Sequence, residues 1–222
     1  MKTRTTKRRP IRISIAAAAL AVLAIGAALL LINQKRERPP LTADEIASAL
    51  AGNEYSSGEE RAVVEAAVSL VGKVHYFWGG KYDGIGPDPA WGELREVTSE
   101  GSATTGEERP WGLDCSGFVT WAFIQAGFGP ADIGHGTWNQ WYASEQIDLG
   151  DIRPGDLVFA NSYPGNRGNH IGICIGFIDG EAVAVHCSSS FDNVVVTRVE
   201  DGFKYFRRPI LWADAQQNGV AG

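Results

Sequence analysis

The sequence is poor in cysteine and histidine, with three and four of them among 222 residues. An odd number of cysteines cannot all pair in disulfides, so at least one thiol stays free. Internal repeats and low-complexity tracts are also lacking, which excludes an array of tandem binding modules. Charged residues make up 21% and apolar residues 44%, a balance typical of a globular protein and not of a disordered chain.

Positive charge is scarce outside the first forty residues. Residues 1–40 carry nine lysines and arginines against the single acidic Glu37, a net charge of +8, although the whole chain has a net charge of −6. The remaining residues therefore carry a net charge of −14, which argues against a nucleic-acid-binding surface. A basic N-terminal segment followed by an acidic remainder is typical of a chain with an N-terminal sorting signal.

One long apolar run occupies residues 13–32, with Ser14 as its only polar side chain. As an α-helix this run would span about 30 Å, the thickness of the hydrocarbon core of a bilayer. Six basic residues precede it and three follow it, so the positive-inside rule predicts a cytoplasmic tail over residues 1–12 and an extracytoplasmic body. The run is longer than the apolar region of a cleaved signal peptide and ends in bulky residues. We therefore expect an uncleaved single-pass anchor, with a cleaved signal peptide as the alternative.

The remainder is predicted to divide into a stalk with a short helix over 33–57, one domain over 58–213 and a tail over 214–222. Capping-box patterns open two helices, of which the second ends near Gly72. Residues 81–111 are rich in Gly, Pro, Thr and charge, which predicts a long loop of the kind that forms lids or binding loops. Helical patterns come first and strand patterns afterwards, so we expect an α+β fold with N-terminal helices packed on an antiparallel sheet.

The segment GLDCSGFVTW, from Gly112 to Trp121, places a cysteine at the start of a predicted helix. Asp114 suits the N-cap position, and Gly127 suits the end of the helix. The unpaired N–H groups of a first turn favour a thiolate and can stabilise an oxyanion, so Cys115 is a candidate nucleophile. By residue pattern alone, a buried structural cysteine explains this position equally well.

Two of the four histidines belong to neighbouring strands. His170 precedes the run IGICIGFI and His186 ends the run EAVAVH, with Asp179 and Gly180 at the turn between them. A three-residue loop would gather the isoleucines, the valines and Phe177 on one face, and both histidines with small residues on the other. We expect the cysteine-bearing helix to pack on the histidine face, which would bring a base and its orienting group to the thiol.

The other histidines and cysteines are expected to be structural. His75 and His135 lie beside turn residues and have no identifiable partner. Cys174 is expected in the apolar core, and Cys187 on the strand face that is turned away from His170, so these two cysteines should not form a disulfide. The remaining predicted elements are a helix from Thr137 and strands over residues 157–160, 171–178, 181–187, 194–199 and 203–210.

Five motifs, in this order, resemble the NlpC/P60 family of papain-like cell-wall cysteine peptidases: YFWGG, GLDCSGFV, RPGDLVF, NHIGICIG and AVAVH. They cover roughly residues 59–210. The resemblance implies hydrolysis of an amide bond in the peptide stem of peptidoglycan, often the bond that follows D-glutamate. The sequence departs from the family in its 34 residues between Gly80 and Cys115 and in a longer hairpin between the two histidines, and both departures bear on the substrate subtype.

Carried onto this sequence, the resemblance implies that Cys115 is the nucleophile, His170 the general base and His186 the group that orients the imidazole. It also implies that Tyr76 assists the oxyanion, and that no metal or cofactor is required. Asp114 fits a plain helix cap as well as a substrate contact. The residues expected to contact substrate are Trp78, Trp111, Asp114 and Ser116.

These observations predict a membrane-anchored extracytoplasmic cysteine peptidase, whose partners are the stem peptides and the membrane and not nucleic acid. One alternative is an amidase or acyltransferase that uses the same cysteine and histidine on another substrate. A second alternative is a non-catalytic wall-binding domain. The presence of every catalytic side chain favours an enzyme over this second alternative.

Overall fold

The structure is a computed structural model, and it describes residues 38–163 and 169–212. The predicted anchor over residues 13–32, the tail before it and the C-terminal tail lie outside the described residues. No helix in the described part of the chain is long and apolar enough to cross a bilayer.

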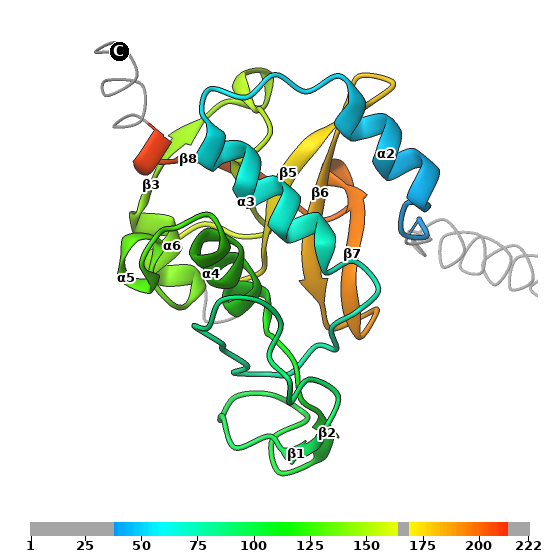
Figure 1. The fold of residues 1–222 in the computed structure, drawn as a ribbon, viewed down its shortest axis with the longest axis vertical. Helices are drawn as coiled ribbons and strands as arrows, with labels where there is room; N and C mark the ends of the chain where they lie inside the picture. The colour runs from blue at the N-terminus through cyan, green and yellow to red at the C-terminus, as the bar shows by residue number, and fades with distance from the viewer. Residues whose placement is uncertain (1–37, 164–168, 213–222) are drawn as a thin grey trace, which may run out of the picture. The chain divides into compact units, whose positions relative to one another are not determined.

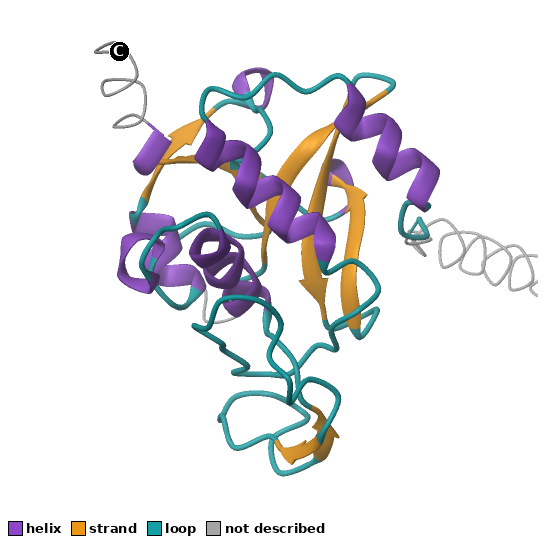
Figure 2. Cartoon of the chain, viewed as in Figure 1, coloured by secondary structure: helices purple, strands orange, loops and turns teal. Residues whose placement is uncertain are grey.

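The structure combines helices and strands (Figure 2). Most helices belong to the first half of the described chain and most strands to the second. The helices are α2 (Ala43–Ala51), α3 (Gly58–Ser69), α4 (Cys115–Gln125), α5 (Pro130–Ile133) and α6 (Thr137–Tyr142), with 3-10 turns η1 (Leu149–Asp151) and η2 (Val199–Asp201). The strands are β1 (Leu94–Glu96), β2 (Glu108–Pro110), β3 (Ser144–Ile147), β4 (Leu157–Phe159), β5 (Ile171–Ile178), β6 (Glu181–Ser188), β7 (Asn193–Arg198) and β8 (Tyr205–Pro209). The predicted α+β order is confirmed.

The main sheet has six strands in the order β3-β8-β4-β5-β6-β7, and every neighbouring pair is antiparallel. Figure 1 shows β5, β6 and β7 side by side. Helices α2, α3 and α4 contribute side chains such as Val63 and Phe118 to one large cluster with Ile171 and Ile173 of β5. A smaller cluster, which includes Cys174, lies on the opposite face. The sheet therefore has one face covered by helices and one covered by short turns.

The caps that the sequence predicted position the first two helices. Thr42 and Glu45 form the capping box of α2, and the Ser57 side chain accepts a hydrogen bond from the Glu60 N–H at the start of α3. Helix α3 ends at Ser69, just before the left-handed glycine that the sequence marked as its stop. These contacts satisfy N–H groups that have no partner inside the helix.

Two predicted elements differ in the structure, and a third element was not predicted. The helix that begins at Thr137 ends at Tyr142, and Ser144–Ile147 continues as an edge strand, because β8 provides a pairing partner that local propensity cannot reveal. Residues 81–111 are not a structureless loop, since β1 and β2 form a two-stranded sheet within this segment. The short helix α5 was not predicted.

The hairpin between the two histidines has a different turn from the one predicted. Asp179 and Gly180 both have positive φ angles, 52° and 82°, as a two-residue turn requires. A bulge between Cys174 and Gly176 then shifts the register. On the side of the bulge away from the turn, the two strands therefore pair in the register that the predicted three-residue loop would have given. Phe177, on the turn side of the bulge, is therefore 40% exposed instead of joining the isoleucine face.

The bulge packs closely against α2 and the residues that follow it. Gly176 has a φ of 145°, and a Cβ atom there would lie 2.3 Å from the Ala49 carbonyl oxygen. The Ile175 carbonyl accepts a hydrogen bond of 2.7 Å from the Asn53 side chain.

The second prediction about this hairpin, that α4 packs on the histidine face, was wrong as well. Helix α4 packs on the isoleucine face, because its own large apolar side chains bury more surface there. On the histidine face lies Phe203, whose ring contacts both imidazoles.

Candidate active site

The start of α4 holds the cysteine that the sequence singled out. Asp114 has the extended backbone of an N-cap, and its side chain accepts a 2.7 Å hydrogen bond from the Gly117 N–H. Cys115 is the first helical residue and is 6% exposed. A Cβ at Gly117 would lie 2.2 Å from the Gly80 carbonyl oxygen. The small size of Gly117 therefore serves close packing of the Gly-Gly turn against the helix, rather than access of a substrate.

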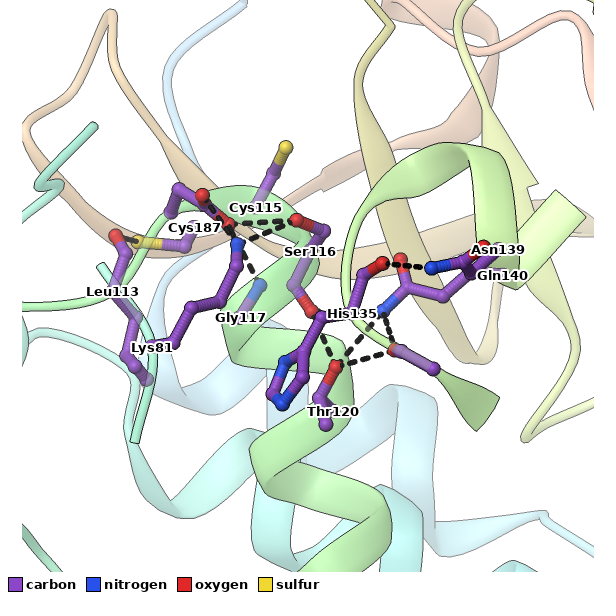
Figure 3. Close-up of polar contacts among 12 residues, drawn as sticks. Lys81, Leu113, Cys115, Ser116, Gly117, Thr120, His135, Asn139, Gln140 and Cys187 are labelled. Atoms are coloured by element: carbon purple, nitrogen blue, oxygen red, sulfur yellow. Dashed lines mark hydrogen bonds and ion pairs between the residues drawn. The ribbon is translucent and has the colours of Figure 1, made fainter. Parts of the chain in front are cut away.

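Lys81 completes the polar network at this helix start (Figure 3). Its ammonium group pairs with the Asp114 carboxylate and lies 2.8 Å from the Ser116 hydroxyl. Ser116 also donates a 2.8 Å hydrogen bond to Asp114. Asp114 and Ser116, two predicted substrate contacts, are thus engaged with each other and with Lys81. In the same view the sulfur of Cys115 points away from this network.

The sulfur lies against the backbone on both sides of His170. Its distance to the Asn169 carbonyl oxygen is 4.0 Å, and the N–H group of Ile171 donates a hydrogen bond to it. The Asn169 side chain is itself held by the backbone of Asn161, with hydrogen bonds of 2.8 Å and 2.6 Å. The sulfur of Cys115 therefore lies against the backbone that flanks the first histidine, although α4 does not pack on the histidine face as predicted.

The two predicted histidines form a hydrogen-bonded chain. Nε2 of His170 lies 2.7 Å from Nδ1 of His186, and Nε2 of His186 lies 3.1 Å from the Thr197 hydroxyl. Phe203 stacks on the His170 ring at 5.6 Å between centroids. With each imidazole protonated on Nε2, His170 donates to His186 and His186 donates to Thr197. Nδ1 of His170 then remains a basic nitrogen.

Burial sets the protonation states of these groups. It raises the pKa of the Cys115 thiol to about 12, and the Asp114 carboxylate adds to this, while Lys81 and backbone N–H groups act in the opposite direction. Burial also lowers the pKa of His170 to about 4 and holds the pKa of His186 well below its usual value. The sequence favoured a thiolate, and this prediction was wrong for the free protein: burial outweighs the helix start, so thiol and imidazole are both neutral.

Tyr76 approaches the helix start from the preceding segment. It forms a parallel bridge with Leu113, and its backbone N–H donates a 3.2 Å hydrogen bond to Asp192. Burial raises the pKa of the Tyr76 phenol, and a negative charge on the Cys115 sulfur, when it ionises, and on Asp114 raises it further. The phenol is therefore neutral and close enough to Cys115 to be affected by the charge of its sulfur.

The two predicted tryptophan contacts differ in their surroundings. Trp78 donates from its indole nitrogen to the Glu100 carbonyl at 3.0 Å and lines a small pocket that Tyr76 also lines. Trp111 donates to Asp88 at 2.8 Å and carries Arg95 over its ring at 4.7 Å. Trp111 thus packs the 81–111 segment together.

The remaining histidines have partners that the sequence did not reveal. His75 lies 3.1 Å from Asp192, and His135 lies 3.1 Å from Asp83. The described residues include no cluster of three or more metal-ligating side chains. The site residues that sequence reasoning missed are Lys81, Asn169, Asp192, Thr197 and Phe203. Only Lys81 and Asn169 had a local signal, because Lys81 directly follows the YFWGG motif and Asn169 is the first residue of the NHIGICIG motif.

The other two cysteines occupy the positions that were predicted. Cys174 belongs to the smaller cluster, whereas Cys187 belongs to the larger one and donates to the Leu113 carbonyl at 3.1 Å. They therefore face opposite sides of the sheet, and all three cysteines are free. The prediction that they form no disulfide is confirmed.

The site combines a buried cysteine at a helix start with two linked imidazoles, and the backbone next to one of them contacts the sulfur. These are the types of group that a cysteine hydrolase uses. The family comparison is specific: the NlpC/P60 family model matches residues 73–207, more than half of the chain. The chain therefore belongs to the NlpC/P60 family.

Relatives and solved structures carry related names. A probable endopeptidase of Mycobacterium tuberculosis is 30% identical over 134 residues, which are 60% of this chain and 25% of the relative. The chain thus spans a quarter of the length of that relative. The peptidoglycan hydrolase RipB of M. tuberculosis is 22% identical, with a TM-score of 0.48 and coverage of 89% of this chain and 86% of RipB. RipD of M. tuberculosis, described as a non-catalytic NlpC/p60 protein, is 17% identical, with a TM-score of 0.47 and coverage of 69% and 98%.

Proposed function

We propose that this chain is a cysteine peptidase that hydrolyses an amide bond in the peptide stems of peptidoglycan, with Cys115 as nucleophile. The observation that carries the proposal is the position of the Cys115 sulfur, against the backbone on both sides of His170. His170 is in turn held by His186 and Thr197. A purely structural cysteine has no need of an ordered chain of two imidazoles and a hydroxyl.

In the first step the sulfur attacks the carbonyl carbon and the thiol proton passes to Nδ1 of His170. An S–C bond forms while the carbonyl π electrons move to oxygen. The His186 imidazole stabilises the resulting imidazolium, because it accepts the Nε2–H hydrogen bond of His170. The Cys115 N–H, which has no acceptor within its helix, and the neutral Tyr76 phenol stabilise the oxyanion.

In the second step the tetrahedral intermediate collapses and the C–N bond breaks. His170 returns the proton to the leaving amine, and the acyl group remains on sulfur as a thioester. His170 then takes a proton from water, whose oxygen attacks the thioester carbonyl. Cleavage of the C–S bond returns the thiol and releases the new carboxylate. The cycle uses only groups of this chain and one water molecule.

The family resemblance supports a finer proposal, that the bond cleaved follows D-glutamate in the stem. The test is mass spectrometry of the products formed from defined muropeptides by the full chain and by its Cys115→Ala variant. We expect two peptide fragments that separate at the D-glutamyl bond, with no cleavage by the variant. Intact muropeptides with the full chain, together with release of acyl groups from a model ester, would instead favour an amidase or acyltransferase.

The sequence supports a further part of the proposal, that residues 13–32 anchor the enzyme in a membrane with the peptidase domain on the extracytoplasmic side. The run is uncharged and is preceded by six basic residues. Membrane fractionation tests the anchor, and protease treatment of intact cells tests the orientation. Recovery of the mature protein from the medium, shortened at its N-terminus, would mean that a signal peptide is cleaved.

A further inference from the structure

A small pocket beside the candidate active site is built by the segment in which this sequence departs from its family. Its volume is about 70 Å³, a few times the volume of one water molecule. One wall comes from the 81–111 segment, and the other comes from the Tyr76–Trp78 stretch and the turn between β6 and β7. The residues that line it are Tyr76, Trp78, Val97, Ser102, Thr104, Arg109, Ser189 and Asp192.

The pocket carries one charge of each sign. Arg109 lies on β2, and the carboxylate that pairs with it, Glu107, is 3.9 Å away at a solvent-exposed position. Asp192 is held in place by His75 at 3.1 Å and by the Tyr76 N–H at 3.2 Å. Its backbone has a φ of 47°, which is uncommon for a residue other than glycine. A carboxylate accepts about four hydrogen bonds, so Asp192 retains acceptor capacity.

The pocket adjoins the nucleophile through Tyr76. This residue lines the pocket and also bridges to Leu113, two residues before Cys115. Trp78 is fixed against the inserted segment by its hydrogen bond to the Glu100 carbonyl. A group seated between Arg109 and Asp192 would therefore belong to a residue close to the bond under attack.

The charges define the chemical class of the occupant. A lone ammonium group would be repelled by Arg109, and a lone carboxylate would be repelled by Asp192. A head group that carries both would place its carboxylate on the guanidinium and its ammonium on Asp192, with the hydroxyl-bearing side chains as further partners. In a stem peptide such a zwitterionic head group occurs only at the side-chain end of a diamino-dicarboxylic residue.

We infer that the pocket formed by Arg109 and Asp192 recognises the zwitterionic side-chain end of diaminopimelate, and that Arg109 makes this enzyme prefer diaminopimelate over lysine in the stem. The inference rests on the proposed function, because it concerns the substrate of the same site. It goes further in naming a specificity residue, which lies on the inserted hairpin and outside the motifs shared with the family.

The experiment compares three synthetic stem peptides that differ only in their third residue: diaminopimelate, lysine, and diaminopimelate with its side-chain carboxylate amidated. Cleavage by the full chain should give a kcat/KM that is at least about tenfold higher for the first peptide, since a charge-assisted bidentate contact is lost in the other two. The Arg109→Met variant should bring the three values to within a few-fold. Arg109→Lys keeps the cation and should retain part of the preference.

Arg95 provides a matched control. It is the cross-strand partner of Arg109, but its guanidinium stacks on Trp111 and it does not line the pocket. The Arg95→Met variant removes the same charge from the same hairpin and should leave the preference intact. If Arg95→Met reduces the preference as much as Arg109→Met does, the effect comes from the hairpin and the inference is overturned.

A binding measurement separates this inference from the proposed function. The full-length Cys115→Ala variant, titrated with each peptide by calorimetry, should bind the diaminopimelate peptide at least about tenfold more tightly than the other two. Free glycine, which carries the same head group without a stem, should compete only at much higher concentration. If no peptide is cleaved but this order of affinities holds, the proposed function fails and the inference stands. Equal affinities, or glycine competing as well as the peptide does, overturn the inference.

Discussion

Removal of the Lys81 ammonium group should weaken both the fold and the reactivity of the nucleophile. In the structure this group pairs with the Asp114 carboxylate, which also caps α4 through the Gly117 N–H. The Lys81→Met variant leaves that carboxylate without its cation beside Cys115. Because Asp114 raises the pKa of the Cys115 thiol and Lys81 lowers it, the variant should shift this pKa further upward.

The magnitude follows from the burial of the pair. Removing one partner of a fully buried ion pair costs about 3–5 kcal/mol. The Lys81 side chain is 29% exposed and that of Asp114 is 11% exposed, so solvent screening reduces the expected cost to about 2 kcal/mol. The Asp114→Asn change removes the charge but keeps the cap, since asparagine is as good an N-cap as aspartate. In the double variant a neutral cap faces a neutral side chain, so most of the loss should be recovered.

The assay is a double-mutant cycle on the full chain, with urea unfolding followed by tryptophan fluorescence. The expected coupling free energy between the two positions is about 1–2 kcal/mol. In parallel, the rate of Cys115 alkylation by iodoacetamide should fall in Lys81→Met and recover in the double variant. Additive effects on stability, or an alkylation rate that Lys81→Met leaves unchanged, would refute the assigned role of this ion pair.

Four further outcomes are expected. Because burial lowers the pKa of His170 to about 4, the base stays neutral to unusually low pH, and the acid limb of kcat/KM for the cleaved peptide should lie near 4 and not near 6.5. Between pH 6.5 and 4 the unfolded chain protonates His170 and the folded protein does not, so the free energy of unfolding should fall by about 3 kcal/mol over this range; urea titrations with His170→Ala as reference check this. Gly176→Ala should lower the free energy of unfolding by about 2–4 kcal/mol, because its Cβ would meet the Ala49 carbonyl, whereas Gly150→Ala, with open space around it, serves as the control. Peptide mapping should show Cys115, which is 6% exposed, alkylated well before the fully buried Cys174, and equal rates would contradict the exposure of the thiol.

Local chemistry was sufficient to predict several elements of the fold. The pattern from Asp114 to Gly127 predicted α4 and its cap, because capping residues act on backbone groups within a few positions of themselves. Strands β5 and β6 were predicted with nearly correct bounds, since their apolar β-branched runs are interrupted by a turn that favours positive φ. The pairing of His170 with His186 followed from strand register.

Other features depended on contacts between distant segments. The two-residue turn and the bulge at Gly176 depend on α2, which approaches the strand from more than a hundred residues away in sequence. Helix α4 packs on the isoleucine face because its apolar side chains are buried there, although the residues on the histidine face are smaller. Thr197 reaches His186 because β7 pairs with β6, and Phe203 contacts His186 because it follows the turn η2. No sequence motif marks either residue.

The sequence by itself determined which atoms could react: a thiol at a helix start, two imidazoles on one strand pair and a phenol in the preceding motif. The tertiary structure decided their protonation states and their surroundings, because desolvation depends on everything packed around a group and not on its neighbours in the chain. Burial made the thiol and the imidazole neutral, and the inserted hairpin brought Arg109 into the lining of the pocket that Asp192 also lines. No local pattern encodes either result, since both arise only when segments far apart in sequence come into contact.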